Sequence, residues 1–472
     1  MSGRNKYKDL TKNTALFALS TFGARFINFI LLPLYTYILT TEEYGTIDLV
    51  LTAVQLLLPI LTLNIQDAVL RFAIDKENDS NDVISVAVKL IVISSIPLGI
   101  VLLILRGTGI IKLDQQYLVY LFVTFIANAT YNSFSMYLKA VNKVKIFAVA
   151  GLVHTLSTGL LNLLLLLVVR MGVTGYLIAN CSGTIIAIIL MFTWGGIYKS
   201  LRTNTSNKQL IRLMVLYSSP LIANSLAWWL NNASDRYILT YYCGTALNGI
   251  YAISYKIPTI LSTIQNIFYN AWSISAITEF DKEDRDGFIG NIYSLYSSAC
   301  ILVCSIILLL NIPVASILYS KDFFEAWHYV PMLLVGTVFN GLALFEGCIF
   351  TAVKQTKTVS STTVVGAVVN TALNFLLIPK FGAYGAAFAT MVGYITIWGV
   401  RAIRLRNVIR MKIKWKSLIP AVCALFIQCF LAEFNGSKFV VLQVLIILSI
   451  LFFLRSMLKE LLHTIFRRVF RK

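Results

Sequence analysis

The stretch ARFINFILLPLYTYILTTEEYGTIDLV, residues 24–50, joins two apolar segments through a short acidic turn. Its first part predicts a helix that carries Arg25, passes Pro33 and ends near Leu39, and a second helix is expected to begin after Gly45. A charge deep in a hydrocarbon layer costs about 2.5–3.5 kcal/mol on insertion scales. We therefore expect Arg25 to face protein or water, although an arginine near a helix end can also extend to the lipid head groups.

The composition of the chain indicates a polytopic membrane protein. Of its 472 residues, 58% are hydrophobic and only 13% are charged, about half of what soluble domains carry. The 40 Lys and Arg residues against 21 Asp and Glu give a net charge of +19, but the cations lie between apolar segments. Membrane topology and anionic lipids explain them better than a nucleic acid partner. There is no CxxC pair, Walker A, HExxH or nucleophile-elbow motif, so we expect neither a cofactor, a metal nor a catalytic site.

Apolar segments long enough for a hydrocarbon core of about 30 Å, which takes roughly 20 helical residues, predict an all-α protein with about 14 transmembrane helices. The predicted spans are 14–39, 46–70, 83–105, 116–138, 146–169, 173–198, 211–233, 246–277, 289–311, 327–352, 358–379, 383–400, 417–433 and 438–457. With the N-terminus in the cytoplasm, 31 of the 40 Lys and Arg residues lie in cytoplasmic tails and loops or at the cytoplasmic ends of spans, 7 lie in outer loops or at outer ends, and 2 lie deep within spans. This bias follows the positive-inside rule, so both termini are expected in the cytoplasm.

The junction between the first two spans recurs later in the chain. Asn28 and Gly45 flank this junction, and Asn232 and Gly249 flank the junction of the seventh and eighth spans, 204 residues further on. Apolar sequences produce chance matches easily, so a single recurrence of this kind would mean little. A second recurrence with a similar offset is needed to indicate a duplication.

A second pair of motifs recurs with a similar offset. MGVTG at 171–175 matches FGAYG at 381–385, which is 210 residues later. Together the two recurrences predict two six-helix lobes in the same orientation, 1–205 and 206–412, related by a parallel pseudo-repeat. The remaining segment, 413–472, is expected to form two further helices and a basic cytoplasmic tail.

Charged residues inside the spans are the main candidate functional residues, because a charge at that depth is usually functional. Arg25 and Lys256 would belong to opposite lobes and face each other across a central cavity. Two cations without an evident carboxylate at their level favour an anionic ligand such as a diphosphate, with one guanidinium for bidentate contact and one ammonium as a point charge. The alternative for Lys256 is a structural partner such as a backbone carbonyl or Asp48.

Other polar side chains could also contact a ligand. Arg71 and Lys89 lie closer to the cytoplasmic rim, where they could attract an anionic head group, although topology alone also explains them. Trp228 and Asn232 in the seventh span could contact a glycan, although packing is the favoured role for the tryptophan.

Ion or proton coupling needs an acid that can change its charge within the membrane. Glu346, in the middle of the tenth span, and Asp48, in the second, are the candidates. The alternative for Glu346 is a neutral glutamic acid that is hydrogen-bonded to a neighbouring helix.

Several segments resemble oligosaccharide flippases of the polysaccharide-transporter type. They are FINFILLPLYTYILTTEEYGTIDLV (26–50), DRYILTYYCGTALNGIYAISYKI (235–257) and the GxxG junctions at 172–175 and 382–385. The LTTEEYG turn at 39–45 is the most distinctive of them, and the resemblance covers nearly the whole chain. These flippases belong to the multidrug/oligosaccharidyl-lipid/polysaccharide (MOP) exporter superfamily.

The resemblance implies a V-shaped, MATE-like transporter that alternates access and is not an enzyme. Such a protein would move an undecaprenyl-diphosphate-linked oligosaccharide from the inner to the outer leaflet of the bacterial cytoplasmic membrane, for O-antigen, capsule or exopolysaccharide synthesis. Implied partners are this lipid-linked glycan, membrane lipids, a polymerase and a chain-length regulator. The cationic cavity of the family would correspond to Arg25 and Lys256. A peptidoglycan-precursor flippase and a multidrug extruder remain the alternatives, the second disfavoured because cationic drugs need buried acids.

Overall fold

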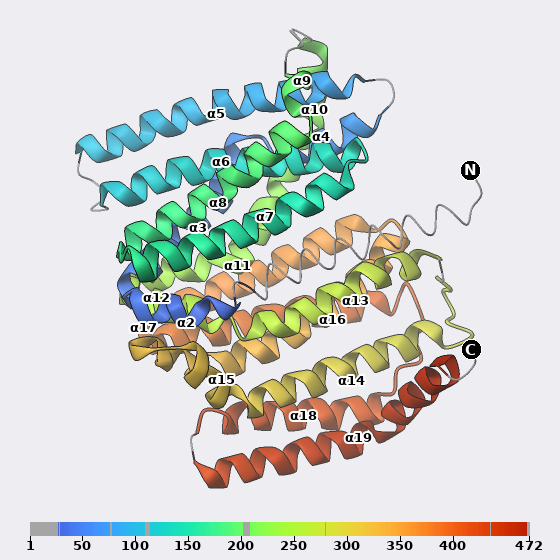
Figure 1. Cartoon of the computed structure of the whole chain (residues 1–472). Coiled ribbons are helices and arrows are strands. Elements are labelled where there is room, and N and C mark those ends of the chain that lie inside the picture. Colours follow the sequence, from blue (N-terminus) through green and yellow to red (C-terminus); the bar gives the residue numbers. More distant parts are fainter. Residues whose placement is uncertain are drawn as a thin grey trace. The chain divides into compact units, whose positions relative to one another are not determined.

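The computed structural model of the chain describes residues 27, 29–75, 78–108, 114–201, 208–278, 280–434 and 436–469. These residues form helices joined by short turns and contain no strand (Figure 1). Nine of the described helices are long and apolar enough to cross a membrane. Each predicted span after the first coincides with one helix, with two consecutive helices or with one half of α17, which confirms the all-α polytopic fold.

The chain divides into two compact units, Met1–Trp229 and Leu230–Lys472. The division falls within helix α11. The domain boundary predicted between residues 205 and 206 lies outside the described residues and stays a prediction.

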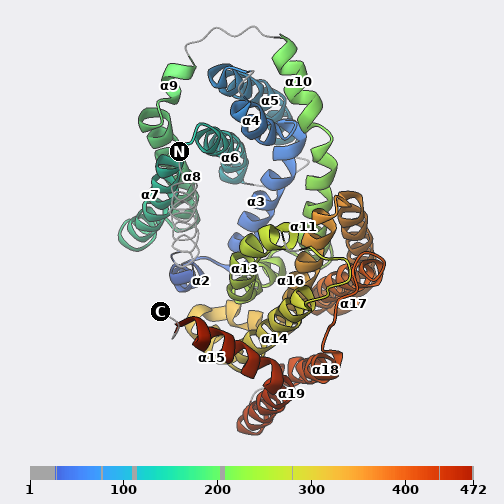
Figure 2. The same ribbon diagram turned by 90° about the vertical axis from the view of Figure 1, so that its right-hand side faces the viewer.

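In unit 1 the long helices lie side by side, and α6 contacts α3, α4, α5, α7 and α8 (Figure 2). The elements in chain order are α2 (Leu32–Ile38), α3 (Thr41–Leu61), α4 (Ile65–Ile74), α5 (Ser80–Thr108), α6 (Gln115–Ala140), α7 (Val144–Leu163), the π-helix η1 (Leu164–Val168), α8 (Gly172–Trp194), α9 (Ile197–Ser200), α10 (Lys208–Ser218) and the first part of α11 (Leu221–Cys243). A cluster of buried aliphatic, aromatic and methionine side chains, from the helices α4 to α10, forms a core in this unit.

In unit 2 the central helix is α16, which packs against α13, α14, α17 and α18 and is buried along most of its length. After the end of α11 the elements are α12 (Thr245–Ser254), α13 (Pro258–Thr278), α14 (Phe288–Leu309), α15 (Asn311–Leu318), the 3₁₀-helix η2 (Lys321–His328), α16 (Val330–Ala352), α17 (Thr356–Leu405), α18 (Trp415–Leu431) and α19 (Ser437–Val469). The last two helices pack against α14.

The acidic turn of the opening stretch is a helix N-terminus. The Thr40 hydroxyl accepts a hydrogen bond from the Glu43 backbone N–H at 3.2 Å, and the Glu43 carboxylate accepts one from the Thr40 N–H at 2.8 Å. This reciprocal capping box satisfies two backbone donors that the first turn of a helix leaves open. Helix α3 therefore begins at Thr41, and the expectation that it begins after Gly45 was wrong.

The predicted spans 46–70 and 246–277 are among those that are interrupted in the structure. The span 46–70 breaks between α3 and α4, where Leu63 and Asn64 both have positive φ angles. The span 246–277 breaks at residues 255–257, between α12 and α13. A break frees backbone N–H and C=O groups, and inside a membrane these are tolerated only where they face protein or water.

The two GxxG junctions have the same geometry, as the predicted duplication requires. Gly172, at the start of α8, and Gly382, inside α17, both have φ of +55°, a conformation that glycine adopts without steric cost. A Cβ atom on Gly175 or Gly385 would lie 2.7–3.2 Å from a carbonyl oxygen of the preceding helix, so both positions need glycine for close packing. The helix pair α7–α8 of unit 1 thus recurs in unit 2 as the two halves of α17.

The loop before α14 is tied to the linker between α17 and α18. The buried Asp284 carboxylate accepts hydrogen bonds from the backbone N–H groups of Ile289 and Gly290 at 3.0 Å and from that of Lys412 at 3.4 Å. Gly290 lies so close to the linker that a Cβ atom would be 2.8 Å from the Lys412 carbonyl oxygen. One carboxylate therefore caps α14 and holds the linker against it.

We expect Asp284→Asn to destabilise unit 2 by about 1–2 kcal/mol, because the amide keeps the shape but loses the charge that these N–H groups bind. The melting temperature of the purified protein measures the effect. Asp286→Asn, in the same loop but exposed, is the matched control. Equal melting temperatures for the two variants would contradict the role of Asp284.

Candidate functional site

Lys256 lies in the interruption between α12 and α13. Its backbone N–H donates to the Ile253 carbonyl at 2.9 Å, and its own carbonyl accepts a hydrogen bond from the Thr259 hydroxyl. The side chain is half-buried, and no described residue bonds with its ammonium group. Arg25, its predicted partner, lies outside the described residues, so the predicted diphosphate site of Arg25 and Lys256 stays a prediction.

Tyr255, the residue before Lys256, is one of several hydroxyl groups that enclose a buried carboxylate. Asp235 on α11 is 1% exposed, and its Oδ2 accepts hydrogen bonds from Tyr251 at 2.7 Å and Tyr255 at 3.0 Å. Thr390 donates to the same oxygen at 3.4 Å, and the Arg236 backbone N–H donates to Oδ1 at 2.9 Å. Bonds from both sides offset much of the cost of burying this acid.

The hydrogen-bond network continues along α17. Asn370 donates from Nδ2 to Thr390 at 3.3 Å, and Asn374 donates to Oδ1 of Asn370 at 3.0 Å. The Oδ1 atom of Asn374 is buried and has no hydrogen-bond partner among the described residues. Carboxylate, hydroxyl and amide oxygens are the ligands that hard cations prefer, so this network is where a cation or a proton could be held. No cluster of three His, Cys, Asp or Glu occurs in the described ranges.

The pair Asp235–Arg236 was not predicted as part of the site, because hydropathy placed it beyond the end of the seventh span. Helix α11 in fact continues to Cys243. Asp235 can be buried within it because Tyr251 and Tyr255 donate hydrogen bonds to its carboxylate. The guanidinium of Arg236 lies over the ring of Tyr255, with 5.2 Å between its central carbon and the ring centroid. Asp235, Arg236, Tyr251 and Tyr255, from the two ends of the DRYILTYYCGTALNGIYAISYKI motif, therefore form one polar cluster in the structure.

Asn232 lies three residues before Asp235 on α11. Its Oδ1 accepts a hydrogen bond from the Tyr394 hydroxyl at 2.9 Å, while the asparagine itself is exposed. Its predicted glycan contact stays a prediction, as does that of Trp228, which is half-buried in unit 1.

The other candidates in unit 1 have the following positions. Arg71 on α4 and Lys89 on α5 are exposed, and Asp48 on α3 is half-buried. Exposure is compatible both with attraction of a head group and with a topology signal, so the roles predicted for these three residues stay predictions.

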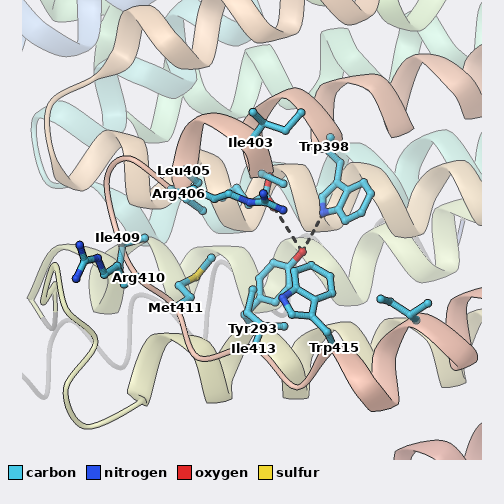
Figure 3. A pocket seen from close by; sticks show the side chains of 14 residues that line it. Tyr293, Trp398, Ile403, Leu405, Arg406, Ile409, Arg410, Met411, Ile413 and Trp415 are labelled. Atoms are coloured by element: carbon cyan, nitrogen blue, oxygen red, sulfur yellow. Dashed lines mark hydrogen bonds between the residues drawn. The ribbon is translucent and has the colours of Figure 1, made fainter.

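Glu346 is an almost completely buried acid on α16, with 1% of its surface exposed. Tyr293 donates from its hydroxyl to Oε1 at 3.5 Å, and Trp398 donates to that hydroxyl at 2.9 Å. The other oxygen, Oε2, has no hydrogen-bond partner in the described part of the chain. Glu346 lines a pocket of about 700 Å³, in which Trp398 and Tyr293 are joined by their hydrogen bond (Figure 3).

Arg401 is a buried cation that sequence reasoning missed. It is 2% exposed and donates to the carbonyl of Ala343 at 2.6 Å and to the hydroxyls of Thr362 and Thr363 at 2.9 and 3.0 Å. We counted it as a cytoplasmic loop cation because the predicted span ended at residue 400, whereas α17 continues to Leu405. The described part of unit 2 thus contains a buried cation in addition to the half-buried Lys256.

A family model and a sequence relative match the chain. The model of the polysaccharide biosynthesis protein family matches residues 10–274, which is more than half of the chain. An uncharacterized membrane protein of Methanocaldococcus jannaschii, MJ1068, is 24% identical over 199 residues, which are 39% of each chain. The match thus spans about two fifths of that relative's length.

Solved structures of transporters share the fold. The lipid II flippase MurJ in an inward closed conformation is 14% identical, with a TM-score of 0.69 over 95% of this chain and 100% of that chain. An inward-facing multidrug resistance MATE transporter of the MOP superfamily is 13% identical, with a TM-score of 0.60 over 83% and 95%. A MOP superfamily transporter from Pyrococcus furiosus is 14% identical, with a TM-score of 0.57 over 84% and 95%.

At these identities the solved structures establish the fold alone, and they confirm the MATE-like fold that the sequence predicted. The nine apolar helices in the described ranges agree with a multi-pass membrane protein. The family model confirms the resemblance read from the motifs. The chain is thus a multi-pass membrane protein with the fold of MOP superfamily transporters, and it belongs to the polysaccharide biosynthesis protein family.

Proposed function

We propose that the protein is a flippase, not an enzyme, that moves an undecaprenyl-diphosphate-linked oligosaccharide across the bacterial cytoplasmic membrane. It would carry the glycan from the inner to the outer leaflet for surface polysaccharide synthesis, with both termini in the cytoplasm. The observation that carries the proposal is Lys256, a half-buried cation at a helix break without a described partner. Family membership supports the glycan part of the substrate.

The chemistry of the helix break favours an anionic ligand. An ammonium group within a membrane span is costly unless an opposite charge or water meets it. The carboxylate of Asp235, which is bonded to the neighbouring Tyr255, is already bound by Tyr251 and Thr390 as well, so it leaves Lys256 available for a ligand. A diphosphate supplies the required negative charge, and Arg25 remains the second residue that we propose to bind it.

Coupling to an ion or proton gradient requires a buried acid whose affinity for the ion or proton differs between the two states of the transporter. Glu346 and Asp48 remain candidates, and the structure adds Asp235 to them. Asp235 is the strongest of the three because it is bonded to Tyr255, the residue next to Lys256 in the helix break. A change in its protonation or in a cation near it would act directly on the break.

The peptidoglycan-precursor flippase remains the nearest alternative, since MurJ shares the fold. Expression in cells depleted of their own peptidoglycan-precursor flippase separates the two functions. Our proposal expects no rescue of growth, and rescue would favour the alternative. A polymerase and a chain-length regulator are the partners expected under the proposal.

Lys256→Ala is expected to lower surface polysaccharide at least about tenfold in cells that depend on this protein, because a lost ionic contact of roughly 1.5–3 kcal/mol corresponds to a factor of 10 or more. Lys256→Arg should retain part of the activity, since it keeps the charge. Lys357→Ala, an exposed lysine at the start of α17, is the matched control. Immunoblots of membranes verify equal amounts of protein, and normal polysaccharide with Lys256→Ala would refute the assignment.

Asp235→Asn is expected to abolish the dependence of transport on the driving gradient, because the amide can neither release a proton nor balance a cation. Transport into vesicles under imposed proton or sodium gradients measures this dependence. Glu346→Gln and Asp48→Asn are compared in the same assay and should keep it. Retained dependence in Asp235→Asn, with its loss in one of the others, would transfer the coupling role to that residue.

A further inference from the structure

The pocket beside the end of α17 contains no residue of the proposed diphosphate site. It lies within unit 2 and is lined by residues of α14, α16, α17 and α18 and of the linker between the last two. Its volume of about 700 Å³ falls within the range of about 300–1,000 Å³ that is usual for small-molecule sites. It is thus large enough for a polar head group together with the first part of an alkyl chain.

The walls of the pocket are mostly aliphatic. Ile403, Ile413 and Ile419 line it together with the indoles of Trp398 and Trp415 (Figure 3). Tryptophans are enriched at the level of the lipid head groups, where an apolar ring and a polar N–H are both accommodated. The wall chemistry therefore suits an amphiphile at the membrane interface.

Two arginines line this apolar space. Arg406 extends from the end of α17 toward Trp398 and Tyr293 (Figure 3), and its guanidinium has no hydrogen bond or ion pair with any described residue. Arg410 lies at the other end of the pocket and is paired with Glu283 at 3.4 Å. Arg406 is therefore the cationic group available to a ligand.

Glu346 also lines the pocket, and its neighbours determine whether an anionic ligand can bind beside it. The buried cation Arg401 lies near Glu346. Oε1 of Glu346 accepts a hydrogen bond from Tyr293, whereas Oε2 has no partner among the described residues. A ligand with both a negative group for Arg406 and a hydroxyl donor for Oε2 would satisfy the pocket fully.

We propose that this pocket binds an anionic phospholipid of the adjacent leaflet, with a glycerol head group as in phosphatidylglycerol. The phosphodiester would bind Arg406, a head-group hydroxyl would donate to Glu346, and the acyl chain would pack on the isoleucines. A guanidinium matches the geometry of phosphate oxygens, and basic pockets between transmembrane helices commonly hold anionic head groups. The aliphatic walls favour a lipid over free phosphate.

The bound lipid would act as a structural ligand of the C-terminal helices. Asp284 already holds the linker against α14 through the Lys412 N–H. A lipid that bridges the end of α17 and the start of α18 would fix the other side of the same linker. It would therefore stabilise the attachment of α18 and α19, whether or not the protein transports a glycan.

Thermal unfolding of the purified, delipidated full-length protein tests the proposal with three added probes. Phosphatidylglycerol is expected to raise the melting temperature by about 3–6 °C at saturating concentration. Phosphatidylcholine and inorganic phosphate should each raise it by less than about 1 °C. An equal shift with phosphatidylcholine would overturn the anionic head group, and an equal shift with phosphate would overturn the lipid.

Variants locate the site. Arg406→Gln is expected to weaken phosphatidylglycerol binding at least about tenfold, and Ile403→Asp should do the same by repelling the acyl chain from its wall. Arg404→Gln is the matched control, because that arginine lies on the same helix end but binds the Ser361 hydroxyl. Both tested side chains are exposed, so folding should persist. Unchanged binding in Arg406→Gln, or an equal loss in Arg404→Gln, would overturn the proposal.

Discussion

Backbone hydrogen bonding inside the hydrocarbon layer is the constraint on which the rest of this structure depends. Water is absent there, so N–H and C=O groups must be paired within helices, and every break needs protein or water beside it. The breaks at 62–64 and 255–257 and the turns at Gly172 and Gly382 are therefore informative positions. The second of these breaks carries Lys256, beside the buried polar cluster, which is why the candidate site is found there.

Buried charges in unit 2 differ in how completely they are satisfied, and this difference separates structural from functional roles. Arg401 donates to carbonyl and threonine oxygens of α16 and α17 and thereby holds the two helices together. Asp235 is enclosed by hydroxyl groups and stands at one end of a hydrogen-bond network. At the other end, Oδ1 of Asn374 has no hydrogen-bond partner among the described residues. Glu346 has one open oxygen and faces a pocket. We expect ions, protons or lipid head groups to bind where a buried side-chain oxygen has no hydrogen-bond partner.

The sequence predicted the helices well and the site only in part, for physical reasons. Apolar length and the glycine pairs depend on local sequence, so the spans and the duplicated GxxG corners were predictable. The capping box of Thr40 and Glu43 could also be recognised from the sequence, but we expected the helix to begin only after Gly45. Arg401 and Asp235 could not be recognised, because their partners lie 39 and 16 residues away and both residues follow directly after the end of a predicted span. A contact between Lys256 and Arg25 would likewise join residues far apart in the sequence, so local patterns do not predict it.

The central claim is that the protein moves a diphosphate-linked glycan lipid by way of the cation in the α12–α13 break. Flipping of a fluorescent undecaprenyl-diphosphate oligosaccharide by the purified protein in proteoliposomes tests it most directly. The account predicts translocation that Lys256→Ala reduces at least about tenfold and that the matching monophosphate lipid undergoes more slowly. Equal translocation by wild type and Lys256→Ala, or none above empty vesicles, would contradict it.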